Sequence, residues 1–180
     1  MSPEYLAGLF DGEGCIDVQR MYSTIAKYKD RLYIRPRVRM CMSDNSLFLG
    51  HELHKIFGGH ISRRKSTSKN QQNSWSLEWL SQEDIKGILS VILPHLVLKV
   101  EQAKLALWWF DNMSGRQAHI VRDAGINQVR QAFCDELKAM KQDPQRLSER
   151  ATERLLSLMR QSDPTGDRGT EVETPSALAA

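Results

Sequence analysis

Two carboxylates near the start of the chain, Asp11 and Glu13, stand among glycines directly after a short apolar segment. This segment, residues 5–10, is predicted to be helical, because Ser2 suits an N-cap and Pro3 suits the first helical position. The C-terminal end of a helix carries partial negative charge, so acids placed there are repelled unless a cation lies opposite them. The pattern therefore predicts either an ordinary Asp-Gly turn or a site that holds a cation.

The helix before these acids has a glycine in its middle, in the run Leu6-Ala7-Gly8-Leu9. A glycine inside a helix costs about 1 kcal/mol relative to alanine. Small residues on one side of a helix allow another backbone to approach closely. The segment therefore favours two such helices packed together, with an acid from each brought side by side.

Composition limits the class of protein. With 180 residues, 41% of them hydrophobic, the chain can form one core with an appendage. Its three cysteines, Cys15, Cys41 and Cys134, have no metal-ligand spacing and favour a reducing compartment. We expect an intracellular protein, in the cytoplasm, the nucleoid or an organelle, and not a secreted one. The longest apolar run, residues 85–100, contains lysines and a proline, so we expect no membrane partner.

Positive charge is concentrated in one part of the chain. Residues 14–70 contain twelve Lys or Arg and four Asp or Glu, a local excess of +8, whereas residues 161–180 contain one Arg and four acids. Because the basic residues fall where strands are expected, this distribution favours a polyanionic partner.

Alternation predicts the first pair of strands, "CIDVQRM" and "RLYIRPRVRMCM". In the second strand, one face carries Tyr33, Arg35, Arg37, Arg39 and Cys41, and the other face is apolar. Pro36 removes a ladder hydrogen bond and predicts an edge or a bulge there. Asp44 is then expected to cap a helix that runs to Phe57.

A second pair of strands, "HISRRK" and "SWSLEWL", precedes a helix that Ser81 opens and that runs to Leu93. After Pro94, "LVLKVEQAKLALWWF" is expected to form another helix to about Asn112. The predicted order is αββαββα, an α+β fold, with a core over residues 1–115. Residues 116–160 are predicted to be a helical extension, as two helices over 117–142 and 144–160 with Asp143 as a cap; they could clasp the core or contact the polyanionic partner beyond it. Residues 161–180 are predicted to be a disordered tail.

The stretch "YLAGLFDGEG" resembles the motif that names the LAGLIDADG homing endonucleases. It matches at Leu6, Ala7, Gly8, Leu9, Asp11 and Gly14, and Glu13 replaces the second aspartate. The predicted element order, "FGG" after the second helix and "PHLVLKVEQAKLAL" extend the resemblance over about residues 3–113. It implies an antiparallel, saddle-shaped sheet with helices on one face.

The resemblance also implies metal-dependent hydrolysis of DNA phosphodiester bonds. It assigns Glu13 as a catalytic residue and metal ligand with Gly12 beside it, Lys99 as a second catalytic residue, and Asp11 as a residue that ties down the turn after the helix. The expected cofactor is Mg²⁺, which suits carboxylate, water and phosphate oxygens. Met42 lies near a position where many relatives carry a water-ordering glutamine, so either Ser43 or Asp44 takes that role or the water network differs.

A single motif implies a homodimer, because "LALWWFDNMSG" lacks the small pair and the second acid of a further copy. The dimer would cut both strands of a long pseudo-palindromic site in double-stranded DNA. Its expected interface residues are Leu6, Ala7, Gly8, Phe10 and Asp11. The expected DNA-binding residues are Asp17, Gln19, Tyr33, Arg35, Arg37, Arg39, Arg63 and Lys65.

Three functions fit this resemblance. The first is a site-specific homing endonuclease encoded within an intron or a similar mobile element. The second is a maturase that binds intron RNA and assists splicing, and the third is a DNA-binding regulator that has lost the chemistry. Glu13 together with Lys99 favours the first. A zinc site at His51, His54 and His60 is not favoured, because no cysteine accompanies them.

Overall fold

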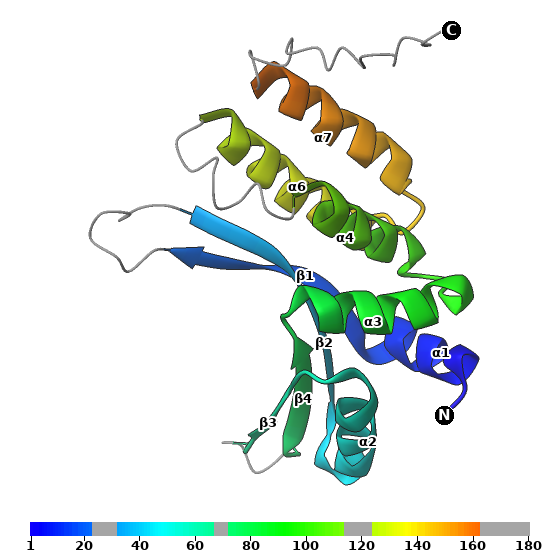
Figure 1. The fold of residues 1–180 in the computed structure, drawn as a ribbon. Helices are drawn as coiled ribbons and strands as arrows, with labels where there is room; N and C mark the ends of the chain where they lie inside the picture. The colour runs from blue at the N-terminus through cyan, green and yellow to red at the C-terminus, as the bar shows by residue number, and fades with distance from the viewer. Residues whose placement is uncertain (23–31, 67–71, 114–123, 163–180) are drawn as a thin grey trace, which may run out of the picture.

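The computed structural model describes residues 1–22, 32–66, 72–113 and 124–162, with the side chains of residues 22, 32, 124 and 126 left out. The helices of this part of the chain are α1 (Pro3–Glu13), α2 (Leu47–Phe57), α3 (Gln82–Ile92), α4 (Val100–Met113), α6 (Ala124–Gln142) and α7 (Ser148–Ser162). Its strands are β1 (Gly14–Tyr22), β2 (Leu32–Ser43), β3 (His60–Arg64) and β4 (Ser74–Trp79). Short 3₁₀ turns lie at Asp44–Ser46 and Leu93–His95 (Figure 1).

The four strands form one antiparallel sheet in the order β1-β2-β4-β3. Gly14–Tyr22 pairs with residues 32–40 of β2, and β4 joins β2 only from Val38 onward. Pro36 therefore lies where β2 has a neighbour on one side only, which is the edge position that its missing N–H predicts.

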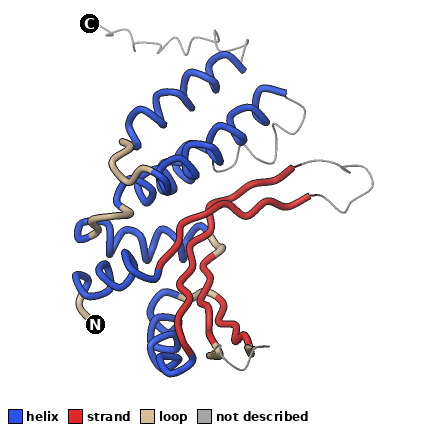
Figure 2. Tube along the Cα trace, turned by 180° about the vertical axis from the view of Figure 1, so that it is seen from behind, coloured by secondary structure: helices blue, strands red, loops and turns tan. Residues whose placement is uncertain are grey.

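Helices cover one face of this sheet (Figures 1 and 2). The even-numbered residues Ile34, Val38 and Met40 of β2 are buried on that side, together with Trp75 and its apolar neighbours of β4. The odd-numbered residues of β1 and β2 point to the other face, which we call the open face. This α+β arrangement confirms the predicted fold class and the order αββαββα.

Helix α1 is built as its sequence predicts. Ser2 Oγ accepts a hydrogen bond from the Tyr5 N–H at 3.3 Å, and Pro3 occupies the first turn. Leu6, Ala7 and Phe10 are buried in the core of the chain. Gly8 lies on the opposite, exposed side of the helix.

A glycine is required where α1 passes into β1. A Cβ at Gly14 would come within 2.4 Å of the Phe10 ring and 2.5 Å of the Phe10 carbonyl oxygen. This close approach lets the chain turn from helix to strand within one residue. Glu13, the last residue of α1, is placed at that turn.

The Asp11 carboxylate joins the end of α1 to the segment before α4. Its oxygens accept hydrogen bonds from three successive backbone N–H groups, those of Val97 at 2.7 Å, Leu98 at 3.2 Å and Lys99 at 3.0 Å. The Lys99 ammonium in turn donates to the Asp11 carbonyl oxygen. Asp11 therefore links segments that are 86 to 88 residues apart in the sequence.

The same hydrogen bonds correct a predicted boundary. The helix expected from residue 96 begins instead at Val100, because residues 97–99 direct their N–H groups to Asp11. A second correction concerns Asp44, which does not cap α2. The α2 helix begins at Leu47 after a 3₁₀ turn, and the Asp44 carboxylate pairs with Arg63.

The C-terminal helices α6 and α7 pack on α4. The rings of Trp109 and Phe133 lie 4.2 Å apart between α4 and α6. Buried Glu101 of α4 accepts hydrogen bonds from the Ser148 N–H at 2.7 Å and Ser148 Oγ at 2.6 Å, at the start of α7. The helix predicted from Pro144 thus begins at Ser148, while Asp143 accepts from the Gln145 N–H within a turn.

Some predictions fall outside the described residues. These are the connection over 23–30, most of the loop between β3 and β4, the start of the helical extension, and the tail from residue 163 onward. None of the described helices is both long enough and apolar enough to cross a bilayer.

We expect Asp11→Ala to lower the free energy of unfolding by about 3 kcal/mol, because three backbone N–H groups lose a charged acceptor at once. Urea unfolding at pH 7 measures this difference. The matched control is Asp111→Ala, since Asp111 is 60% exposed and pairs with Lys86 at the surface. Its loss should stay below about 1 kcal/mol. Equal losses for the two variants would contradict the linking role of Asp11.

Glu101 makes stability depend on pH. Burial raises the pKa of Glu101, but hydrogen bonds from Lys104 and Ser148 outweigh burial and hold it below the ordinary value of 4.5. A carboxyl whose folded-state pKa is lowered stabilises the protein above that ordinary value, and the contribution is lost as the pH falls through the folded-state pKa.

We expect Glu101→Gln to lower the free energy of unfolding by about 1–2 kcal/mol at pH 7. The gap to the wild type should close as the pH falls below 4.5. Urea midpoints from pH 7 to pH 3 measure it, with exposed Glu153→Gln as the control. A gap that stays constant over this range would show that the charge of Glu101 contributes nothing.

Candidate active site and nucleic-acid interface

The open face carries a row of arginines on β2, each opposite a polar residue of β1. Arg35 lies opposite Gln19 and Arg37 opposite Asp17. Arg35 Nε donates to Gln19 Oε1 at 3.0 Å. The structure thus brings these four predicted DNA-binding residues together on one surface, as strand alternation predicts.

Asp17 binds two of the arginines. Arg37 donates to it through Nε at 2.7 Å and Nη2 at 3.0 Å, and Arg39 Nη2 lies 3.3 Å from the same carboxylate. The hydrogen bond to Asp17 raises the pKa of Arg37 above its ordinary value, although burial opposes it. Tyr33 follows on the same face, opposite Met21. These contacts hold the guanidinium groups in place along the strand.

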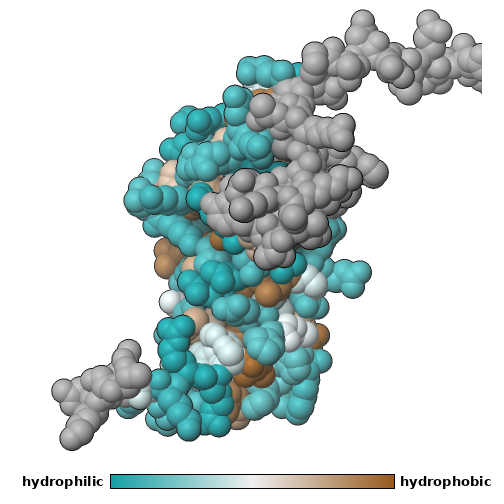
Figure 3. Space-filling model, turned by 90° about the vertical axis from the view of Figure 1, so that its left-hand side faces the viewer, coloured by the Kyte–Doolittle hydropathy of each residue, from teal (hydrophilic) through white to brown (hydrophobic). Residues whose placement is uncertain are grey.

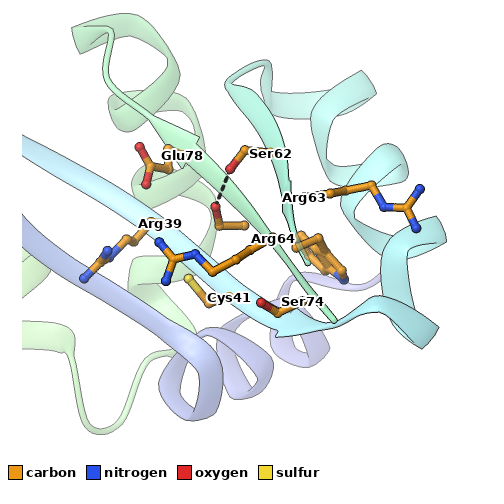
Figure 4. A pocket seen from close by; sticks show the side chains of 9 residues that line it. Arg39, Cys41, Ser62, Arg63, Arg64, Ser74 and Glu78 are labelled. Atoms are coloured by element: carbon orange, nitrogen blue, oxygen red, sulfur yellow. Dashed lines mark hydrogen bonds between the residues drawn. The ribbon is translucent and has the colours of Figure 1, made fainter. Parts of the chain in front are cut away.

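Beside these arginines, the open face forms a hollow of about 310 Å³ over β2, β4 and β3. In Figure 4, Arg39, Cys41 and Arg64 turn toward it, and Ser62 hydrogen-bonds Ser76 across β3 and β4 at 2.8 Å. Figure 3 views the molecule from the left-hand side of Figure 1, and most of its coloured surface is hydrophilic. This surface suits a polar, negatively charged partner.

Arg63 borders the hollow on the open face, but its side chain does not point along that face as predicted. Arg63 pairs with buried Trp75 in the register of β3 and β4, so its side chain leaves the sheet on the helix side. There it donates to Asp44 through Nε at 3.1 Å and through Nη2, and Figure 4 shows it turned away from Arg64. Arg64 takes the place predicted for Arg63.

The sequence contained a signal for Arg64. In "HISRRK", Ile61 is the apolar residue, so it assigns the odd positions to the core side and the even positions to the open face. Lys65 follows β3 and is exposed. With Asp44, Arg64 and Asn73 it lines a smaller hollow of about 180 Å³ at the end of the sheet.

Helix α6 adds basic residues at the edge of β1, which the sequence patterns did not indicate. Lys141 donates to Cys15 Sγ at 3.4 Å. Together with Asp17, Arg20 and Lys138 it lines a hollow between β1 and α6. The positive surface therefore continues from the strands onto the C-terminal extension.

Glu13 and Gly12 lie where α1 meets the sheet, and both are exposed. Within the described part of the chain, the Glu13 carboxylate forms no hydrogen bond or ion pair, unlike the neighbouring Asp11. The ammonium of Lys99 lies at the same end of α1, bound to the Asp11 carbonyl oxygen. The two predicted catalytic residues come from segments far apart in the sequence, and both lie at the C-terminal end of α1.

The described residues contain no cluster of three His, Cys, Asp or Glu side chains suited to a metal ion. His51, His54 and His60 accordingly form no such cluster, and His54 Nδ1 lies 3.2 Å from the Gly58 carbonyl oxygen. A metal at the end of α1 would need ligands from outside the protomer. Mg²⁺ fits that donor set, since it commonly uses one or two carboxylates together with substrate phosphates and waters.

The residues near the expected water-ordering position have other contacts. Met42 packs against the hydrophobic core. Asp44 is paired with Arg63, and the Ser43 carbonyl oxygen accepts from Ser46 Oγ at 2.8 Å. Of the three successive residues 40–42, Cys41 points to the open face, and the two methionines point to the core.

Most of the residues expected at the dimer interface already have contacts within the protomer. Leu6, Ala7 and Phe10 are at most 3% exposed and already pack within the protomer. The Asp11 carboxylate already accepts hydrogen bonds from the backbone N–H groups of residues 97–99. Of the five, only Gly8 lies on the outward side of α1, where no atom comes within 4 Å of a Cβ placed on it.

Exposed apolar side chains surround the outward side of α1, which the sequence patterns did not indicate. Tyr5 is 59% exposed, and Val97 and Leu98, next to the Asp11 carboxylate, are 78% and 54% exposed. Gly12 follows Gly8 by one helical turn and is also open. Residues four apart share a helix side, so the two glycines give α1 a flat outward strip.

A family model described as LAGLIDADG endonuclease matches residues 6–98, which is just over half of the chain. The search of curated proteins found no match to this chain. Among solved structures, the homing endonuclease I-CvuI in complex with its target, in the presence of 2 mM Ca, aligns with a TM-score of 0.58 at 22% identity. That alignment covers 87% of this chain and 94% of I-CvuI.

I-CvuI bound to the I-CreI target in the presence of 2 mM Mg, with the DNA not cleaved, gives the same values. The homing endonuclease I-TnaI aligns with a TM-score of 0.55 at 19% identity, over 88% of this chain and 98% of its own. At these identities the structural likeness establishes the fold. Taken with the sequence match through the motif at Leu6–Gly14, it shows that this chain belongs to the LAGLIDADG endonuclease family.

Proposed function

We propose that this protein is a site-specific DNA endonuclease of the homing type, which hydrolyses both strands of a long pseudo-palindromic site as a homodimer. The observation that carries the proposal is the exposed Glu13 at the end of α1, the helix end that also holds the Lys99 ammonium and that leads into the arginine-bearing sheet. Double-stranded DNA offers this arrangement a phosphate to cut and a major groove for the arginines.

A divalent metal, Mg²⁺ in our proposal, would be held by Glu13 and the Gly12 carbonyl together with DNA phosphate oxygens. When bound, such an ion polarises a phosphodiester and favours ionisation of the attacking water. Lys99 contributes a fixed positive charge near the phosphate. One of its N–H groups donates to the Asp11 carbonyl oxygen, and the two others remain available to oxygens that gain charge as the bond breaks.

Each protomer supplies a single Glu13, so cleavage of both strands requires two copies. We propose that the outward sides of two α1 helices meet through Gly8 and Gly12, with Tyr5, Val97 and Leu98 around them. Helices that meet at glycine can approach closely because no Cβ separates their backbones. This contact would bring the two Glu13 residues together and set the two open faces along one duplex.

Glu13→Gln should abolish cleavage and leave DNA binding intact, because the amide keeps the shape of the side chain and loses the charge that recruits the metal. Cleavage of a randomised duplex library in Mg²⁺ and gel-shift binding in Ca²⁺ measure the two effects. Glu4→Gln, an exposed acid on the same helix, is the control and should cut as the wild type does.

The result also separates the alternatives. A wild type that binds specific duplexes but never cuts them would favour a DNA-binding regulator, and preference for structured RNA would favour a maturase. A Glu13→Gln variant that cuts both strands at the wild-type rate would exclude the metal role of Glu13.

Gly8→Leu should convert the dimer to a monomer and abolish double-strand cleavage while the protomer stays folded. Within the protomer a Cβ placed on Gly8 meets no atom within 4 Å, and leucine favours the helix by most of 1 kcal/mol. If the variant loses the dimer, the leucine side chain therefore clashes with a second copy of the chain and not within its own protomer. Sedimentation at micromolar concentration measures the change.

The matched control is Gly87→Leu, because Gly87 is also an exposed helical glycine with open space around it. This variant should remain a dimer and keep its activity. An unchanged dimer for Gly8→Leu would place the interface elsewhere.

A further inference from the structure

We propose that Asp17 is a positioning residue for sequence recognition, which orients Arg37 so that its guanidinium reads one base pair in each half-site. This inference rests on the proposed DNA-binding function and assigns a separate role within it. The sequence analysis expected Asp17 to contact DNA. In the structure its carboxylate instead binds the arginines of the neighbouring strand.

The geometry of this pair leaves one edge of the guanidinium for a ligand. Arg37 uses Nε and Nη2 on the two oxygens of Asp17, at 2.7 and 3.0 Å. A guanidinium has five N–H groups in a plane, so Nη1 and the second N–H of Nη2 form another two-donor edge. That edge faces away from Asp17.

Burial makes the orientation of Arg37 specific. The side chains of Arg37 and Asp17 are only 23% and 17% exposed, and Asp17 lies directly opposite Arg37 in the strand register. A guanidinium held in this way keeps one orientation before DNA arrives. Guanine presents O6 and N7 to such a fork in the major groove, and a fork fixed in advance loses little conformational freedom on binding.

An acid on this surface lowers the affinity for DNA in general, which favours discrimination between DNA sequences. Asp17 partly neutralises the charge of Arg37 and also that of Arg39, whose Nη2 lies 3.3 Å from Asp17 Oδ2. Its own negative charge repels DNA phosphates. It therefore weakens attraction to any DNA while it fixes the reading group. Arg35 differs, because its partner Gln19 is neutral and binds only Nε, at 3.0 Å.

The test is selection of bound duplexes from a randomised library by the full chain in Ca²⁺, followed by sequencing. With Asp17→Ala, the preference for the favoured base at one symmetric pair of positions should fall about tenfold, in the range for one bidentate contact. The affinity for an unrelated duplex should stay the same or rise. A merely structural role of Asp17 would instead lower the affinity for all duplexes together.

Glu52→Ala is the control, because Glu52 accepts a hydrogen bond from Lys55 within α2, a helix that does not lie on the open face. This variant should keep the wild-type base preference. Arg37→Lys supplies a second test that does not require Asp17→Ala to fold. It keeps the positive charge, removes the fork, and should lose the preference at the same positions.

Three outcomes would overturn the inference: a base preference in Asp17→Ala within about twofold of the wild type at every position, an equal loss in Glu52→Ala, or an unchanged preference in Arg37→Lys. If the wild type enriches no sequence, the proposed function fails and this inference fails with it. A selective wild type with a selective Asp17→Ala variant overturns the inference alone.

Discussion

The three hydrogen bonds from residues 97–99 to the Asp11 carboxylate are the contact on which the site depends. They fix the end of α1 against the segment before α4, across 86 to 88 residues of sequence. The carboxylate is repelled by the helix C-terminus, and backbone N–H groups compensate for that repulsion at short range. The contact also places the Lys99 ammonium at the helix end. Asp11 is therefore occupied, and Glu13 is the acid of the motif that remains accessible.

The open face combines charge with internal restraint. A row of free arginines would attract any polyanion, but the β1 residues opposite them accept hydrogen bonds from two of the guanidinium groups. Because register sets these pairs, the β1–β2 ladder determines which donors remain for a partner. The same rule removes Arg63 from this face and adds Arg64. A single step of alternation thus decides whether an arginine can reach DNA or pairs with Asp44 behind the sheet.

Local signals predicted the elements well, and long-range contacts account for what they missed. The Ser2 cap, the alternation of β2 and the edge position of Pro36 follow from neighbouring residues, and all are found. The start of α4 at Val100 does not follow from neighbouring residues, because residues 97–99 donate their N–H groups to Asp11 and do not join the helix. Asp143 and Pro144 form a plausible helix start, yet α7 begins at Ser148, where Glu101 supplies the buried acceptor. Such partners lie 47 or more residues away, beyond any local pattern.

The two sides of α1 show why the small residues of the motif divide into two groups. Ala7 is fully buried, so its size is set by packing within the protomer, and Gly14 is required by the approach of Phe10. A Cβ placed on Gly8 or Gly12 would meet nothing within 4 Å, and each glycine costs helix stability relative to alanine. No contact inside the described chain accounts for that cost. The proposed contact with a second α1 helix would account for it, because a helix surface without Cβ atoms lets another backbone approach closely. Glu13 follows Gly12 directly and ends α1, so such a contact would also bring the accessible carboxylates of two protomers toward each other.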